Sequence, residues 1–469
     1  MTDDLAFTSA TDLVESYRAK RISPVEATRA VLDRIDKHDE ALNAYVMVDH
    51  EAALAAARES EARWKAGEPK GLVDGVPTSI KDLVLTKGWP TLRGSRTVDP
   101  DQPWDEDAPS VARLREHGAV LLGKTTTPEF GHKGVTDSML TGITRNPWDQ
   151  DKTPGGSSGG ASASVAAGMG PLAIGTDAGG SIRIPASFGG IYGLKPTFGR
   201  VPAYPSSPFG TLAHVGPMTR NVADAALMLT VIAEPDWRDW SALPYDGQDY
   251  REEIEADVRG LRVAYSPALG RADAKVDAEV AALVAAAAKT FEEMGAVVEQ
   301  VDPEWPESLD ETFMTYFASG AAKLISMFTE AQKAKVEPTL MAVVEAGATL
   351  TGLQLKDAEL ERSQLGMTIN GFFEQHDLLL SPTLPMPAFE VGRAYPTPEF
   401  KAKPYGWIPF TYPINLSKHP AASIPCGFTE AGLPVGLQIV GPMYGELSVL
   451  HASRAFEKAA PFQDRRPVL

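Results

Sequence analysis

The sequence predicts an α/β protein in which a large, mixed and twisted β-sheet is flanked by helices. Short apolar segments bounded by glycine and proline alternate along the 469 residues with alanine-rich segments of helical periodicity. Neither an internal repeat nor a disordered linker interrupts this alternation. Strands that alternate with helices are typical of a sheet covered by helices, so we expect a single domain over residues 1–469.

The first part of the chain, residues 9–66, is expected to be helical. Ser9 or Thr11 can cap one helix, and Ser23 followed by Pro24 is a typical start of a second helix. The alanine-rich stretch 51–64 carries its charges on one face, which indicates an amphipathic helix.

From residue 71 onwards the pattern changes to short apolar segments separated by turns. The expected strands are 76–80, 119–123, 172–175, 261–265, 296–301, 378–380 and 436–440. Helices are expected at 221–233, 275–294 and 445–459, and through most of 308–375. We expect residues 71–220 to form the functional core and residues 308–375 to form a helical cover.

Composition and charge narrow the possible functions. The chain is 43% hydrophobic and 23% charged, which is ordinary for a globular protein. Its formal net charge of −18 repels phosphate backbones and anionic bilayers, so neither nucleic acid nor a membrane is an expected partner. The N-terminus does not have the pattern of a signal peptide, and no apolar run approaches the ~18 residues of a membrane span. These features predict a cytoplasmic protein.

Neither metal nor thiol chemistry is indicated. Cys426 is the single cysteine, which excludes an intramolecular disulfide and a CxxC pair, and a lone cysteine is usually a small core residue. The histidines are scattered and no HExxH motif occurs. We therefore expect no metal and no other cofactor.

The passage 153–197 is rich in glycine and serine, yet it keeps an apolar framework that a flexible linker would lack. Its block 155–160 precedes a helical pattern and could cradle a phosphate, but no Lys-Ser/Thr pair follows and no GxGxxG is present. The block also matches the G-x-S-x-G nucleophile elbow at Ser157, although a loop precedes it where that motif needs a strand. The histidines available to such an elbow have no recognisable context: His214, His376, His419 and His451.

A third interpretation accounts for more residues. The Gly-Gly-Ser-Ser-Gly-Gly block that contains Ser157 is followed by Asp-Ala-Gly-Gly-Ser-Ile-Arg at 177–183, and Ser-Ile-Lys-Asp with Lys81 lies upstream. Through these three elements the sequence resembles the amidase signature family. The resemblance covers almost the whole chain, and further matching segments lie at 144–148, 193–197, 216–219, 381–383 and 432–438.

The resemblance implies a serine amidohydrolase with Ser181 as nucleophile, Ser157 as a proton relay in a cis peptide, and Lys81 as base. An amide carbonyl is a poor electrophile, so the serine must lose its proton as it attacks and the oxyanion must be held. Burial disfavours the charged form of lysine and lowers its pKa, so a buried Lys81 can accept a proton. The implied oxyanion hole consists of the backbone amides of Ala178, Gly179, Gly180 and Ser181.

Neighbouring residues are expected to shape this site. Ser158 should form hydrogen bonds within its loop, and Asp177 and Arg183 should form a structural ion pair. The aromatic-rich segment 400–412 is either a strap packed on the sheet or part of an apolar pocket above the nucleophile. On the second interpretation we expect Met139, Phe209 and Trp407 to line the substrate pocket.

The expected function is hydrolysis of linear amides of small molecules through an acyl-enzyme, with apolar or aromatic substrates favoured. Aryl carbamates and esters would suit the same serine, which makes the protein a urethanase candidate. One alternative is the glutaminase subunit of a tRNA-dependent amidotransferase, although no text resembling the C-terminal region of that glutaminase is present. A non-catalytic binding module is disfavoured because Lys81, Ser157 and Ser181 are all intact. We expect a monomer or a homodimer.

Overall fold

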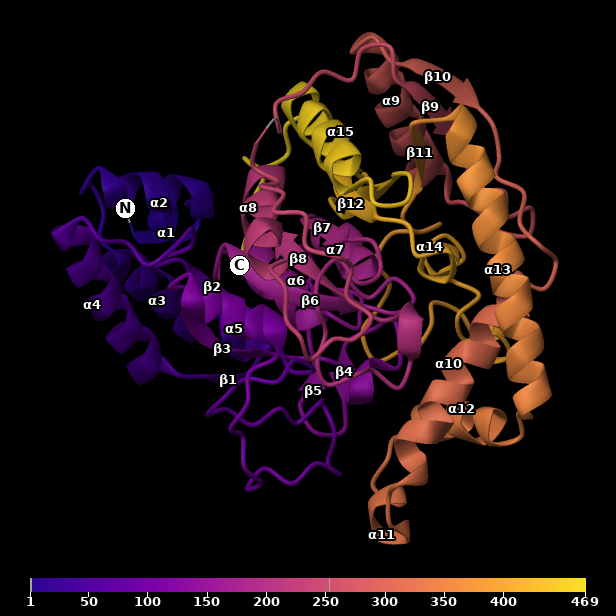
Figure 1. Cartoon of the computed structure of the whole chain (residues 1–469), viewed down its shortest axis with the longest axis horizontal. Coiled ribbons are helices and arrows are strands. Elements are labelled where there is room, and N and C mark those ends of the chain that lie inside the picture. The colour runs from indigo at the N-terminus through magenta and orange to yellow at the C-terminus, as the bar shows by residue number, and fades with distance from the viewer. Residues whose placement is uncertain (1, 253) are drawn as a thin grey trace.

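A mixed sheet of eleven strands forms the centre of the computed structural model, which describes residues 2–252 and 254–469 (Figure 1). In spatial order the strands are β1 (Tyr45–Val48), β3 (Val120–Thr125), β2 (Pro77–Lys81), β6 (Leu172–Asp177), β8 (His214–Thr219), β7 (Tyr192–Lys195), β12 (Ala421–Phe428), β13 (Pro434–Val440), β11 (Leu378–Pro382), β9 (Arg262–Tyr265) and β10 (Val297–Gln300). One sheet thus takes strands from both halves of the chain. This confirms the expected single α/β domain.

Two blocks of parallel strands are joined by antiparallel ones. Strands β3, β2 and β6 are parallel, as are β11, β9 and β10. Between these blocks, β8, β7, β12 and β13 pair antiparallel with their neighbours. A separate two-stranded ribbon is formed by β4 (Asp137–Ser138) and β5 (Gly142–Ile143).

The N-terminal helices are α1 (Thr2–Ala6), α2 (Ala10–Arg18), α3 (Pro24–Leu42) and α4 (His50–Ala66). Ser9 caps α2, and Ser23 forms a capping box with Glu26 at the start of α3, as their positions predict. The expectation that 9–66 is helical is wrong at 45–48, where β1 lies between α3 and α4. Asn43, in the left-handed conformation, ends α3, and the strand that follows has only four residues, too few to show periodicity.

A further group of helices packs against the sheet. They are α5 (Pro109–Glu116), α6 (Gly159–Ala166), α7 (Arg183–Gly189), α8 (Val222–Ile232), α9 (Ala278–Glu293), α14 (Tyr412–Ser417) and α15 (Glu446–Ala459). One apolar core packs α5, α8, α9 and α15 on the sheet, and a second contains α7 and α14. None of the helices within the described residues combines the length and apolar character needed to cross a bilayer.

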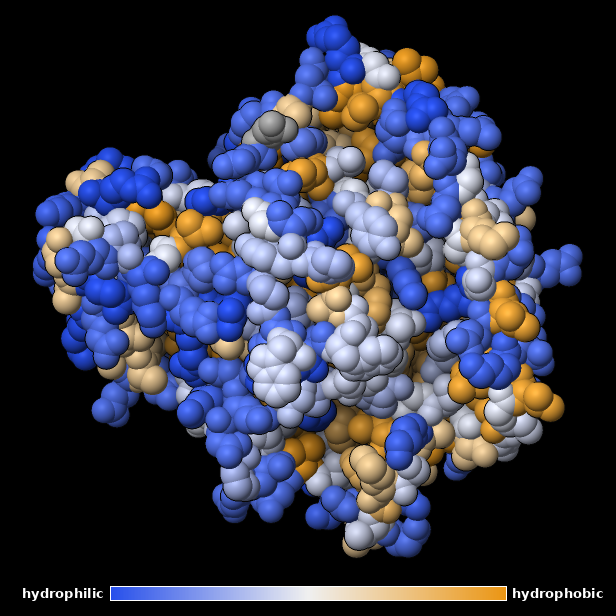
Figure 2. Space-filling model, in the orientation of Figure 1, coloured by the Kyte–Doolittle hydropathy of each residue, from blue (hydrophilic) through white to orange (hydrophobic). Residues whose placement is uncertain are grey.

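The helical cover consists of α10 (Leu309–Ser326), α11 (Glu330–Lys333), α12 (Pro338–Ala348) and α13 (Gly352–Gln375). These helices lie at the end of the molecule opposite the N-terminal helices (Figure 1), and α10, α12 and α13 contribute to the second apolar core. Apolar side chains also appear on the outer surface over this region (Figure 2), where Leu353, Leu360 and Met367 of α13 are exposed. The helical cover therefore packs on the rest of the molecule through its inner face, while part of its outer face is apolar and exposed.

Strands β2 and β6 end at the same edge of the sheet. Because they are parallel and Ile80 pairs with Ile174, Lys81 at the end of β2 lies beside the end of β6, where Thr176 and Asp177 stand. The carboxyl ends of parallel strands are where α/β sheets commonly bind ligands. This edge holds the candidate site.

Candidate active site

Lys81 is fully buried among three hydroxyl groups. Its Nζ donates hydrogen bonds to Ser157 Oγ, Ser158 Oγ and Thr176 Oγ1, each at 2.8 Å. Burial lowers the pKa of Lys81 well below its ordinary value, and the charge of Asp177 opposes this shift only in part. The neutral form of Lys81, which can accept a proton, is therefore accessible at lower pH than for an exposed lysine.

The two serines that contact Lys81 differ in what else they touch. Ser157 lines a cavity together with Ser181, and the peptide bond between Gly156 and Ser157 is cis. Ser158 instead binds β6: its Oγ donates to the carbonyl of Thr176 at 3.2 Å and accepts from the amide of Thr176 at 3.3 Å. Ser158 thus forms hydrogen bonds within the site, as expected, and of these two serines only Ser157 lines the cavity.

The glycines of the block 155–160 permit close packing. A Cβ on Gly156 would lie 2.5 Å from the carbonyl oxygen of Val135, and a Cβ on Gly160 would lie 2.4 Å from the amide nitrogen of Thr126. All six residues of the block are buried. The block therefore packs tightly against neighbouring backbone and does not have the form of an open phosphate loop.

Ser181 lies between β6 and α7, is partly exposed and lines the cavity with Ala178. The amides of Ala178, Gly179 and Ser181 donate to no acceptor within the described part of the chain. The amide of Gly180, by contrast, donates to Asp177 Oδ1 at 2.7 Å. Gly180 is thereby removed from the expected set of oxyanion-hole donors, and three of the four amides are available to a ligand.

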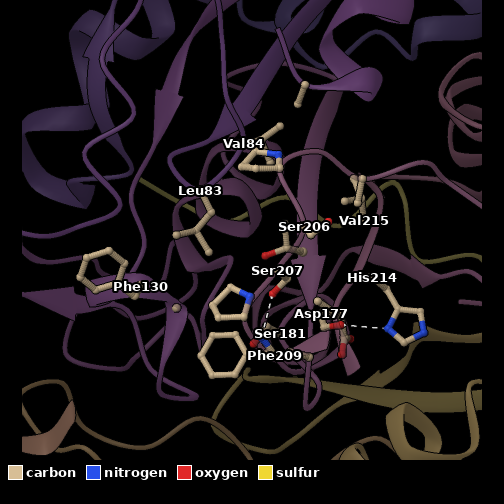
Figure 3. Close-up of a pocket in the computed structure, with 18 of the residues that line it drawn as sticks. Leu83, Val84, Phe130, Asp177, Ser181, Ser206, Ser207, Phe209, His214 and Val215 are labelled. Atoms are coloured by element: carbon tan, nitrogen blue, oxygen red, sulfur yellow. Dashed lines mark hydrogen bonds between the residues drawn. The ribbon is translucent and has the colours of Figure 1, made fainter. Parts of the chain in front are cut away.

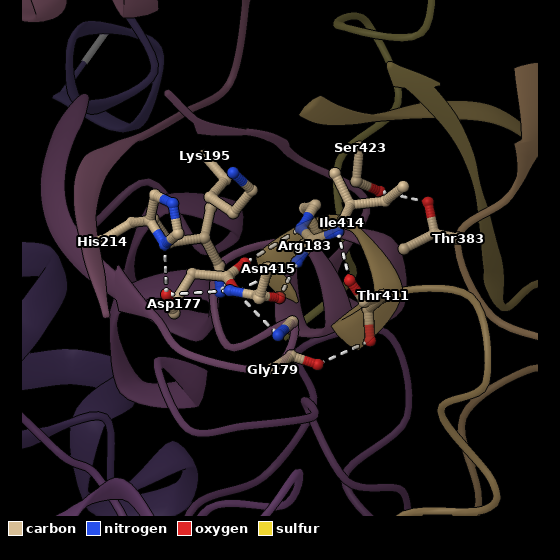
Figure 4. Close-up of polar contacts among 12 residues, drawn as sticks. Asp177, Gly179, Arg183, Lys195, His214, Thr383, Thr411, Ile414, Asn415 and Ser423 are labelled. Carbon is tan, nitrogen blue, oxygen red and sulfur yellow. Dashed lines mark hydrogen bonds and ion pairs between the residues drawn. The ribbon is translucent and has the colours of Figure 1, made fainter. Parts of the chain in front are cut away.

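A buried ion pair holds the loop that carries Ser181 (Figure 4). Arg183 contacts Asp177 through Nε–Oδ2 at 3.0 Å and Nη2–Oδ1 at 3.1 Å, with both side chains fully buried. Burial alone would raise the pKa of Asp177, but the charge and hydrogen bonds of Arg183 hold that pKa well below its ordinary value. Arg183 also donates to the Thr411 carbonyl, Asn415 Oδ1 and Gln438 Oε1 at 2.9, 2.6 and 2.8 Å. The loop is thus joined to α14 and β13.

Replacing Arg183 with methionine is expected to lower the free energy of unfolding by about 3–5 kcal/mol, because Asp177 would be left buried without its cation. Urea denaturation measures this loss. The matched control is Arg18→Met, which breaks an exposed ion pair with Glu15 and should change stability by less than about 1 kcal/mol. Equal stability changes in the two variants would contradict a structural role for the buried pair.

The cavity beside Ser181 has a volume of about 150 Å³. Segment 202–209 lines part of it, and its apolar lining includes Leu83, Val84, Phe130, Phe209, Val215, Phe317 and Leu324. Figure 3 shows Phe209 and Ser207 beside Ser181, with Phe130 and His214 at opposite ends of the cavity. The cavity therefore has a largely apolar wall near Ser181, with Ser206 and Ser207 among its polar lining residues.

Of the three expected pocket residues, only Phe209 lines this cavity. Met139 is 42% exposed on the ribbon β4–β5, where its amide donates to Glu337. Trp407 is 1% exposed and packs against Phe188 and Phe389. The segment 400–412 is thus largely a strap against the protein interior, since burial of its rings contributes to the core rather than to the cavity.

The histidines do not form a nucleophile-elbow triad. His214 lines the cavity, but its Nδ1 faces the carbonyls of Leu212 and Asp177, and burial lowers its pKa well below the ordinary value. His376 contacts Glu299, and the Nδ1 of His419 faces the carbonyl of Ser417. The group that contacts Ser157 is the amine of Lys81.

Two residues of the site were not predicted from the sequence. Thr176, whose hydroxyl contacts Lys81, precedes Asp177 on β6, and its role depends on β2 and β6 being neighbours. Arg93 lines the cavity from a loop after β2 that carries no recognisable motif. No group of three metal-ligating side chains stands in a suitable arrangement among the described residues.

Comparison with known proteins identifies the class to which this fold and site belong. Residues 26–450 match the family model described as Amidase. The crystal structure of a bacterial aryl acylamidase of the amidase signature family superposes with a TM-score of 0.88 at 33% sequence identity, covering 97% of this chain and 96% of that chain. The protein is an amidohydrolase.

Two relatives match over nearly their full lengths. The acylamidase of Rhodococcus erythropolis is 38% identical, over 99% of this chain and 98% of that protein. One of the subunits of the glutamyl-tRNA(Gln) amidotransferase of Myxococcus xanthus is also 38% identical, over 96% of this chain and 97% of that protein. The chain belongs to the amidase signature family.

Proposed function

We propose that the protein hydrolyses linear carboxylic amides through an acyl-enzyme formed on Ser181. The observation that carries this proposal is the position of Ser157, which contacts the buried Lys81 at 2.8 Å and lines the same cavity as Ser181. A proton can therefore pass between the nucleophile and a lysine whose burial favours its neutral form.

In the first half of the reaction, neutral Lys81 accepts a proton from Ser157, which takes the proton of Ser181 as its Oγ attacks the amide carbonyl. The unpaired amides of Ala178, Gly179 and Ser181 would stabilise the oxyanion. Ser157 then returns the proton to the leaving nitrogen, which would otherwise depart as a strongly basic anion. Water then attacks the acyl-enzyme and gives a proton to Ser157, which is relayed to Lys81. Ser157 returns a proton to Ser181 as the acid leaves.

The apolar wall of the cavity favours amides with an aryl or bulky apolar group. Phe130, Phe209 and Phe317 supply aromatic surface close to the nucleophile. The names of two relatives, an acylamidase and an aryl acylamidase, support this substrate class. Aryl carbamates and esters are further expected substrates, because the same serine and oxyanion hole would serve them.

A second candidate is the glutaminase subunit of a tRNA-dependent amidotransferase, which the similarity to the Myxococcus xanthus protein favours. Hydrolysis by the purified chain alone separates the two candidates, with an anilide, an aliphatic primary amide, glutamine, an aryl carbamate and an ester as substrates. Turnover of the anilide or the carbamate without glutamine would support a free-standing amidohydrolase. Activity on glutamine alone, or on no substrate, would favour the partner-dependent glutaminase.

The rate constant kcat/KM is expected to rise with pH, because only the neutral form of Lys81 accepts a proton. Burial lowers the pKa of Lys81 well below its ordinary value of 10.5, so activity should be lost at low pH and reach its plateau well below that value. Anilide hydrolysis from about pH 5 to about pH 10 should show a one-proton acid limb. A flat profile over this range would contradict the assignment of Lys81 as base.

The cytoplasmic location, the monomeric or homodimeric state, and the absence of nucleic acid and membrane partners stay predictions. The expected absence of nucleic acid and membrane partners rests on the acidic composition, with its formal net charge of −18.

A further inference from the structure

Arg93 stands where two hollows of the molecule meet. It lines the cavity beside Ser181, and it also lines an outer groove of about 710 Å³. Phe130 and Leu324 are likewise shared by the two hollows, so the groove leads to the cavity past these three side chains. A substrate that enters by this route passes the guanidinium of Arg93.

The guanidinium of Arg93 has no ion pair and no hydrogen bond to any residue in the described part of the chain. The backbone of Arg93 does form a hydrogen bond, because its carbonyl accepts from the amide of Phe130. The φ angle at Arg93 is 58°, a left-handed conformation that residues other than glycine rarely adopt. Burial lowers the pKa of Arg93. An arginine nevertheless remains protonated throughout the physiological range.

The charged groups around Arg93 do not include a partner for its guanidinium among the described residues. One carboxylate that acts on Arg93, Asp82, is buried and accepts hydrogen bonds from the amides of Leu92 and Gly94. Its charge also acts on the buried Lys124, which Asp107 influences as well. A partly buried guanidinium without a partner carries a desolvation cost, and a bound anion would relieve that cost.

The other charged or titratable groups that line the inner cavity do not offer an equivalent site for an anion. Asp177 is negative and already paired with Arg183, while His214 is neutral at ordinary pH because burial lowers its pKa. The outer groove carries carboxylates at Asp99, Asp105 and Glu106, which repel an anion there. The electrostatically favourable place for a negative group is therefore the junction at Arg93.

We propose that Arg93 binds a carboxylate of the substrate, so that the preferred amides carry an anionic group on their acyl or amine part. This proposal rests on the proposed hydrolysis at Ser181. The planar guanidinium can bind a carboxylate through two parallel hydrogen bonds, which fixes orientation as well as charge. The apolar wall would then hold the remaining part of the substrate.

The test compares two pairs of substrates that differ only in charge. Glutaric acid monoanilide and its methyl-ketone isostere, 5-oxohexanoic anilide, place the difference on the acyl part. The compounds 4-acetamidobenzoate and 4-acetamidoacetophenone place it on the amine part. In at least one pair the charged member should have the higher kcat/KM, and Arg93→Met should lower the charged-to-neutral ratio by about 10- to 100-fold. Which pair responds shows which part carries the anion.

Arg96→Met is the matched control, because Arg96 is an exposed arginine three residues along the same loop. It should leave both ratios unchanged. Equal losses for charged and neutral substrates in Arg93→Met, or ratios unchanged in both pairs, would overturn the proposal.

A binding measurement keeps this result separate from the proposed reaction. In a Ser181→Ala background, titration calorimetry with glutaric acid monoanilide and 4-acetamidobenzoate should show affinity for at least one of them about 10- to 100-fold weaker after Arg93→Met. If the protein hydrolyses none of the four compounds, the proposed reaction fails, but such a loss of affinity would still support the anion site. Equal affinities with and without Arg93 would overturn it whatever the turnover.

Discussion

Replacement of Ser181 by alanine is expected to lower kcat by about 10⁶-fold, the size of effect seen when a serine nucleophile is removed. Among the described residues, no other hydroxyl combines exposure in the cavity with the unpaired amides of Ala178 and Gly179 beside it. The measurement is anilide hydrolysis by the purified variant. Intact-protein mass spectrometry with an activated ester should show an acyl adduct on the wild type and none on the variant.

The matched control is Ser206→Ala, because Ser206 lines the same cavity and is drawn near Ser181 in Figure 3. This variant should keep its rate within a few-fold, about what loss of one neutral contact costs. Both variants should unfold at the temperature of the wild type. Substantial activity in Ser181→Ala would refute the assignment of the nucleophile.

Replacement of Lys81 by methionine is expected to lower kcat by about 10²–10⁴-fold, the usual contribution of a general base. Methionine has nearly the length of lysine and tolerates burial, so the packing around Lys81 should survive while the proton acceptor is lost. The acid limb of the pH profile should disappear with it. Steady-state rates and circular dichroism across the pH range measure both effects.

Lys124→Met provides a matched control, because Lys124 is also fully buried and donates to Val84, Thr86 and Thr91 but contacts neither serine. This change should affect stability more than turnover. If the two variants lost activity equally, the loss would reflect removal of a buried lysine in general. A normal rate in Lys81→Met would exclude Lys81 as the base.

The core of the site could be predicted from sequence because its three motifs are short and their spacing is distinctive. Lys81, Ser157 and Ser158 are in direct contact in the structure, and Ser157 shares the cavity with Ser181. Thr176 could not be predicted, since its role follows from the pairing of β2 with β6, and strand order cannot be deduced from a single chain. A lone arginine such as Arg93 has no pattern that separates it from surface charge.

The errors also have physical reasons. Aromatic residues are typical of cores as well as of pockets, and Trp407 belongs to the core. Strand β8 was not expected because Gly216 and Pro217 interrupt its apolar pattern, and both residues normally disfavour a strand. The four-residue strand β1 was not predicted because it lies between two longer segments with helical periodicity.

The network around Arg183 has a consequence for the order in which the enzyme becomes active during synthesis. Lys81, Ser157 and Ser181 all leave the ribosome early, but the loop that holds Ser181 is joined through Arg183 to Asn415 and Gln438. Those partners stand more than 200 positions later in the chain. A nascent chain therefore carries these three residues long before it can hold the loop of Ser181 in place. We therefore expect activity to appear only when translation is almost complete.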